Sequence, residues 1–186
     1  MQTPLSFSQS TRCPTCGRSR VAAVRPATES DLPVLMSLYE QARHIMRASG
    51  NLHQWTGGYP DVATVLADIR GGYSQLCLDD GGQPVATFAF LPGPEPTYAR
   101  LYDGTWLDDT LPYGVLHRLA KYPEAGGVAE TCLRWCYARI PNLRVDTHRD
   151  NHIMRHLLQS HGFHYCGIIH LANGDERLAY QALHLV

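Results

Sequence analysis

A strand, a glycine turn and a helix follow one another between residues 113 and 140, and this stretch constrains the fold more than any other. Residues 113–120 predict an apolar strand, and a helix begins directly after the paired glycines Gly126 and Gly127. Backbone N–H groups in the first turn of a helix lack intrahelical partners, and the helix dipole adds partial positive charge there. Adjacent glycines let a phosphate approach closely, although many helices open on glycine for conformational reasons alone. The turn by itself leaves both interpretations open.

The elements after the turn predict a βαβ unit. Apolar side chains recur at helical spacing along the helix that ends before Pro141, and a short strand follows at residues 143–147. A second helix is predicted at residues 151–161, with Gly162 as its cap, and a further strand at 163–172. Strands separated by single helices are typical of parallel sheets, which bind ligands at the carboxyl ends of their strands. The Gly126-Gly127 turn lies at such an end.

These residues resemble the GCN5-related N-acetyltransferase (GNAT) family. Its members carry a Gln/Arg-x-x-Gly-x-Gly/Ala turn over the coenzyme A pyrophosphate and an Asn-headed helix that ends in Gly-Phe. Here the turn aligns as Glu124-x-x-Gly127-x-Ala129, and the later helix runs from Asn151 to Gly162-Phe163. The resemblance covers residues 21–181 and implies an α/β fold, a mixed, twisted sheet with helices on both faces, and acetyl-CoA as the cosubstrate.

The resemblance also assigns contacts to the coenzyme. The pantetheine arm would meet the strand backbone, the pyrophosphate would meet the turn, and Asn151 would lie near the thiol end. The residues concerned are Leu116, Arg118 and Leu119 in the strand, and Glu124, Ala125, Gly126, Gly127, Val128 and Ala129 in the turn. Two positions depart from the family pattern: Glu124 replaces Gln or Arg, and Leu158 replaces the Tyr that protonates the departing thiolate in many members. We expect Tyr165, Cys166 or a water to supply that proton.

Acetyl transfer to an amine requires a base for the ammonium proton. His117 lies within the predicted coenzyme-facing strand, and imidazoles exchange protons readily near neutral pH. A single histidine in a strand also fits a core position, so Asp103, Asp146 and His148 remain candidates for the base.

Two loops rich in aromatic residues indicate the chemical class of the acceptor. Residues 51–60 carry Trp55 and Tyr59, and residues 95–109 carry Tyr102 and Trp106 together with several carboxylates. Aromatic faces and carboxylates attract cations, which indicates a small molecule bearing a primary amine. The same residues also fit loops pinned to the core and solvated turns. A non-catalytic acyl-CoA sensor or partner-binding module is the alternative function, because the usual Tyr is missing at Leu158.

The other elements complete a mixed sheet. Helices are predicted at residues 28–47 and 61–70, and strands at 21–25, 74–79, 84–91 and 176–183, with a further piece of strand at 98–106. The hairpin turns lie at Asp79-Asp80-Gly81-Gly82 and Asn173-Gly174.

The N-terminal residues 1–20 lack periodicity and are predicted to be a flexible extension of a single domain formed by residues 21–186. Cys13 and Cys16 form half of a zinc knuckle, and a closed zinc site needs four ligands. His152 and His156 fall on the polar face of their helix, so we expect no physiological metal. Whether Cys13 and Cys16 bind one stays open.

Composition excludes several partners. The formal net charge is −1, without a basic run, so neither nucleic acid nor an anionic membrane surface is expected to bind. The chain has no apolar run long enough to span a bilayer, which favours a cytoplasmic protein. The sequence leaves open whether the chain forms a homodimer.

Overall fold

Seven strands form one mixed sheet in the computed structural model, which describes residues 20–184. The strand order is β1-β2-β3-β4-β5-β7-β6, and only β4 and β5 pair in parallel. The strands are β1 (Ala23–Pro26), β2 (Ser74–Leu78), β3 (Pro84–Pro92), β4 (Gly114–Lys121), β5 (Asn142–Thr147), β6 (His164–His170) and β7 (Glu176–Leu183).

Residues 20–184 form four α-helices, and two of them begin at a side-chain cap. They are α1 (Leu32–Ala48), α2 (Val62–Arg70), α3 (Val128–Tyr137) and α4 (His152–Ser160). The Asp61 side chain accepts a hydrogen bond from the Thr64 amide at the start of α2, and Asn151 does the same for Met154 at the start of α4. These side chains satisfy N–H groups that the helix itself cannot pair. A short 3-10 turn at Glu29–Asp31 precedes α1.

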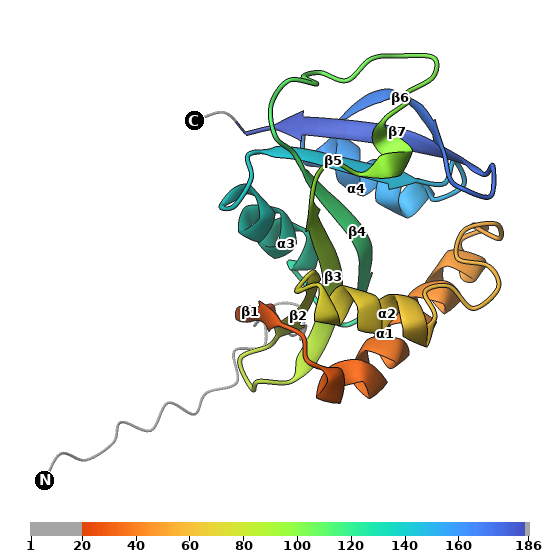
Figure 1. Cartoon of the computed structure of the whole chain (residues 1–186). Helices are drawn as coiled ribbons and strands as arrows, with labels where there is room; N and C mark the ends of the chain where they lie inside the picture. The colour runs from red at the N-terminus through yellow and green to blue at the C-terminus, as the bar shows by residue number, and fades with distance from the viewer. Residues whose placement is uncertain (1–19, 185–186) are drawn as a thin grey trace, which may run out of the picture.

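The helices cover both faces of the sheet, as predicted. Consecutive residues of a strand point to opposite faces. In β2, Leu76 packs in the cluster formed with α1 and α2, whereas Cys77 packs in the cluster formed with α3 and α4. Figure 1 shows α1 and α2 on one side of β4 and α3 on the other. The predicted α/β architecture is therefore confirmed.

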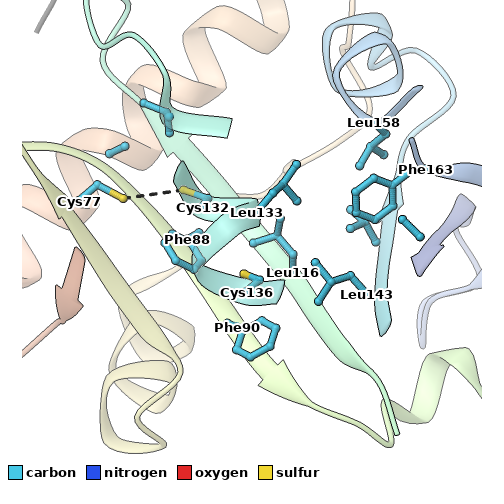
Figure 2. Close-up of a cluster of buried hydrophobic side chains, with 14 of the residues drawn as sticks. Cys77, Phe88, Phe90, Leu116, Cys132, Leu133, Cys136, Leu143, Leu158 and Phe163 are labelled. Carbon is cyan, nitrogen blue, oxygen red and sulfur yellow. Dashed lines mark hydrogen bonds between the residues drawn. The ribbon is translucent and has the colours of Figure 1, made fainter. Parts of the chain in front are cut away.

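The core beneath α3 and α4 joins both halves of the sheet (Figure 2). Its buried side chains include Cys77, Phe88, Phe90, Leu116, Cys132, Leu133, Cys136, Leu143, Leu158 and Phe163. The Sγ atoms of Cys77 and Cys132 lie 3.8 Å apart. Burial raises the pKa of Cys136 to about 12, so this thiol stays protonated and behaves as a small apolar group.

The predicted strand at residues 98–106 is wrong. A 3-10 turn at Pro96–Tyr98 (η2) is followed by irregular chain, with one isolated bridge from Tyr102 to Ile168. Pro94 and Pro96 lack the N–H that a ladder needs, and Asp103 adopts a left-handed φ of 54°. Aromatic packing of Trp106 against Tyr98, with a centroid distance of 5.5 Å, holds the segment in place of strand pairing.

Two further expectations need adjustment. β5 and β6 run in the same direction but are not neighbours, because β7 lies between them and pairs antiparallel with both. The sequence also predicts Ile153 on the apolar face of α4 together with Met154, Leu157 and Leu158, but Ile153 is 52% exposed, because the helix turns only the other three toward the core.

His152 and His156 are exposed, as the helical phase predicted. Across residues 20–184, no three His, Cys, Asp or Glu side chains come together in a group that could hold a metal ion. The helices in this part of the chain are also too short or too polar to cross a membrane. Cys13 and Cys16 lie outside the described residues.

Candidate active site

The site begins where β4 and β5 part. The two strands pair through Gly114 with Leu143 and Val115 with Arg144, and then diverge (Figure 1). On its other side β4 stays paired with β3 as far as Lys121, with a register shift opposite Thr87 to Ala89. Arg118 has a φ of 54° within this irregular part of β4. Such a bulge increases local twist and turns the strand away from its partner.

A cavity of about 380 Å³ lies at this divergence. Both halves of the sheet contribute to it, together with the loop after α1, the loop after β3 and the β6–β7 hairpin. The lining residues include Gln54, Trp55, Tyr59, Glu95, Leu116, His117, Arg118, Leu119, Asp146, Asn151, Met154, Asp175 and Arg177. Cavities of this size hold small ligands in other proteins.

His117 lies between two carboxylates inside the cavity. Its Nδ1 is 3.6 Å from Asp146 Oδ1, and its Nε2 is 3.9 Å from Glu95 Oε2. The three side chains are between 11% and 20% exposed. Sequence reasoning named His117 and Asp146 as alternatives for one role, but the structure brings them together, with Glu95 as a third member.

Hydrogen bonds hold both carboxylates in place. Asp146 Oδ1 accepts from the buried Tyr98 hydroxyl at 2.8 Å, and Glu95 Oε1 accepts from Thr97 Oγ1 at 2.9 Å and from the Thr97 amide at 3.2 Å. The neighbouring His117 ring, together with the bonds from Thr97, lowers the pKa of Glu95 to about 2 against the opposing effect of burial. Glu95 is therefore an anion at every pH at which the protein would work.

The Arg118 side chain turns away from β5 toward α2. It donates to Asp68 Oδ1 at 2.7 Å and to the Tyr59 hydroxyl at 2.8 Å. Burial raises the pKa of Asp68, partly offset by this arginine. Trp55 packs edge-on against Tyr59, with centroids 6.2 Å apart, so the predicted acceptor residues Trp55 and Tyr59 form one wall of the cavity.

Asn151 reaches the cavity through a buried amide network. Its Nδ2 donates to Gln54 Oε1 at 2.9 Å, and Asn51 Nδ2 donates to the same oxygen at 2.8 Å. Sequence reasoning did not identify Gln54 as a site residue, because only tertiary packing brings residues 54 and 151 together.

The glycine turn opens α3 as predicted. Gly127 is the N-cap of the helix, with a left-handed φ of 68°. Lys121 Nζ donates to the backbone oxygens of Tyr122, Pro123 and Ala125 and so shapes the loop before it. Arg20, predicted to belong to the N-terminal extension, forms an isolated β-bridge with Gly126. Its Nε lies about 4 Å from where a Cβ atom would lie on Gly127. Sequence reasoning missed this positive charge beside the turn.

The other predicted site residues lie outside the cavity lining. Asp103 belongs to the irregular loop, His148 packs against His53 with centroids 6.1 Å apart, and Tyr165 is 50% exposed on β6. Tyr102 packs edge-to-face with His170, and Trp106 covers Arg144, so both hold the long loop against the sheet. Cys166 is buried, and its Sγ donates to the His164 carbonyl.

Solved structures with the same architecture identify the family. An acetyltransferase of the GNAT family from Streptococcus agalactiae is 33% identical over 88% of this chain and 96% of its own, with a TM-score of 0.80. This chain belongs to the GNAT acetyltransferase family. No family model matches the sequence, and no curated protein matches it.

More distant structures share the fold of this acetyltransferase. A ribosomal-protein-alanine N-acetyltransferase from Brucella melitensis is 20% identical, covers 87% of this chain and 99% of its own, and has a TM-score of 0.56. A GNAT superfamily phosphinothricin acetyltransferase from Sinorhizobium meliloti, in complex with AcCoA, is 15% identical, covers 88% and 89%, and has a TM-score of 0.59.

Proposed function

We propose that this acetyltransferase moves an acetyl group from acetyl-CoA to the primary amine of a small molecule, with His117 as the general base. One observation carries the proposal: His117 lies between Asp146 and Glu95 in the cavity where β4 and β5 part. Ammonium groups of simple amines have pKa values near 10, so the acceptor arrives charged and must lose a proton before it can attack the thioester carbonyl.

Three features of the chain fit the coenzyme. Gly127 carries no side chain at the first turn of α3, and Arg20 Nε lies about 4 Å from where one would begin. The N–H groups of this turn have no intrahelical partner and suit a pyrophosphate. Leu116 and Leu119 line the divergence of β4, where a pantetheine arm would bind the strand backbone. Asn151 lines the same cavity. When bound there, acetyl-CoA supplies the activated acyl group.

The two carboxylates assist His117 in two ways. Asp146 and Glu95 attract an incoming ammonium group, and both stabilise the imidazolium that forms when His117 takes the proton. Tyr98 orients Asp146 from the far side, in the way that a third group orients a base in other catalytic sets. This arrangement favours turnover over a non-catalytic acyl-CoA sensor.

The donor to the departing thiolate is not Leu158, whose side chain is fully buried in the core (Figure 2). Tyr165 and Cys166 were predicted as replacements, but neither lines the cavity. Burial also raises the pKa of Cys166. We therefore assign the proton to a water in the cavity. Thiolates are good leaving groups. With a water as the proton donor in place of a tyrosine, the rate of acetyl transfer would be lower, but transfer would still occur.

Size and charge support a small acceptor. Part of the 380 Å³ cavity would be filled by the acetyl end of the coenzyme, and Trp55 and Tyr59 are among the residues that line it. Aromatic faces beside carboxylates bind ammonium groups. The Brucella structure is named for a protein substrate and the Sinorhizobium structure for a small one, so membership of the fold does not choose between them.

A competition assay tests the proposal. Acetyl transfer is measured with amino acids, polyamines and aminoglycosides against peptides of varied N-terminal sequence, with each amine present at the same concentration. Preferential acetylation of a free amine is expected. Preferential acetylation of peptides would refute the small-molecule acceptor, and tight acetyl-CoA binding without any turnover would favour the sensor.

A further inference from the structure

Arg177 brings a positive charge to the cavity that Glu95 and Asp146 also line. It lies near the start of β7, is 7% exposed and lines the same cavity as His117, Glu95 and Asp146. It has no role in the acetyl transfer described above. Burying an arginine is costly unless its charge is well paired, so a nearly buried arginine is expected to have close carboxylate partners.

Arg177 is less well paired than the other buried arginines of the sheet. Arg144 contacts Asp109 at 2.7 Å and lies about 4 Å from the centroids of two aromatic rings, and Arg118 contacts Asp68 at 2.7 Å. Among the described residues, Arg177 donates one hydrogen bond, to the Glu176 carbonyl at 2.8 Å. Its nearest carboxylate is that of Asp175, at 3.7 Å from Nη2.

The groups around Arg177 pair its charge only in part. Asp175 is 49% exposed, and its Oδ2 already accepts from Asn173 Nδ2. His148 lies nearby, and burial together with the charge of Arg177 lowers the pKa of its imidazole. The guanidinium therefore keeps donors available toward the cavity, because a planar group with five N–H donors cannot be satisfied by one carbonyl.

Strand register fixes where this charge lies relative to the catalytic residues. Ala179 pairs with Asp146 across β7 and β5, and Arg177 lies two residues earlier on the same face of β7. Two residues of strand correspond to about 7 Å. The cavity therefore presents Asp146 and Glu95 to an ammonium group, and Arg177, beside Asp175, to an anion.

We propose that Arg177 binds a carboxylate of the acceptor, so that the substrate class of this enzyme is amino acids rather than simple amines or polyamines. This inference rests on the proposed function. Guanidinium and carboxylate form paired hydrogen bonds, and such charge-assisted bonds are about twice as strong as neutral ones. The acidic residues and Arg177 together orient the acceptor with its amine toward His117.

The test compares matched acceptors that differ only in the carboxylate. Linear amino acids of increasing chain length are assayed against straight-chain amines of the same lengths, and α-amino acids against their amides. The wild-type enzyme should show a lower KM for the carboxylate member of each pair. In Arg177→Gln this preference should fall by about tenfold to a hundredfold, through KM more than kcat, and Arg177→Lys should restore part of it.

Arg149→Gln is the matched control. Arg149 lies on the same side of the molecule and pairs with Glu176, but it is exposed and does not line the cavity. Arg149→Gln should leave the preference for the carboxylate acceptor unchanged. This result would show that Arg177 acts by direct contact with the carboxylate rather than by long-range attraction. Thermal unfolding of Arg177→Gln and its affinity for acetyl-CoA show whether the variant is intact.

Two results would overturn the inference in distinguishable ways. If free amines are acetylated but the carboxylate makes no difference, or if Arg177→Gln keeps the preference, the assignment of Arg177 fails while the proposed function stands. If peptides are acetylated in preference to every free amine, the proposed function fails and the amino-acid acceptor fails with it.

Discussion

The proposed role of His117 as the general base can be tested by a single substitution. His117→Ala removes the group placed between Asp146 and Glu95, so kcat should fall by about a hundredfold to ten-thousandfold. The affinity for acetyl-CoA, measured by calorimetry, should be retained because the side chain lies at the acceptor end. His148→Ala is the control, since that histidine packs on His53 outside the cavity lining. A large loss of kcat in His148→Ala with little loss in His117→Ala would reverse the assignment.

The lowered pKa of Glu95 should make the free energy of unfolding depend on pH. Its pKa falls from 4.5 to about 2 on folding, so the folded state favours the carboxylate. The stabilisation is complete above about pH 4.5 and is lost as the pH falls toward 2. At 1.36 kcal/mol per pKa unit, this shift corresponds to about 3 kcal/mol. Urea unfolding of wild type and Glu95→Gln should differ by this amount at neutral pH and converge in acid. A difference that does not vary with pH would contradict the assignment.

At the scale of elements, the turn before α3 is tested by Gly127→Asp. The substitution places a carboxylate where we propose that the pyrophosphate binds, so acetyl-CoA affinity should fall by at least tenfold. Gly162→Asp is a matched control, because Gly162 also has a left-handed φ, of 79°, with open space around it, but follows α4. Both variants should lose about 1 kcal/mol of unfolding free energy from backbone strain. Equal coenzyme affinity in the two would argue against the site at Gly127.

At the scale of the whole molecule, the long loop between β3 and β4 ties the two halves of the sheet together (Figure 1). Arg144 of β5 is 1% exposed, donates to the Asp108 carbonyl and to Asp109, and lies beneath Trp106 and Tyr113. Arg144→Met should lower the free energy of unfolding by about 2 to 4 kcal/mol, measured by urea denaturation. Asp109→Asn should cost less than about 1 kcal/mol, because that carboxylate is 72% exposed. Equal losses would mean that the ion pair, rather than the ring contacts, holds the loop.

The sequence by itself determined the elements whose signals are local. Asp61 and Asn151 cap their helices, Gly127 opens α3, and apolar periodicity placed the helices and most strands within a few residues of their observed bounds. These signals come from backbone hydrogen bonding and from the helical and strand repeats, which act over a few residues. The ordered set from β4 to α4 was also enough to predict the family.

Only the tertiary structure decided the composition of the site. The cavity joins Gln54, Glu95, His117, Asp146 and Arg177, which come from both halves of the sheet and from the loops between them. Residues 98–106 resembled a strand in composition, yet their contacts are with side chains of β4 to β7 rather than with a neighbouring ladder. Hydrogen-bonded partners such as Gln54 and Asn151 are 97 residues apart, and no local pattern records such a pairing. Local backbone physics therefore set the elements, whereas long-range packing between side chains set which charges face the cavity.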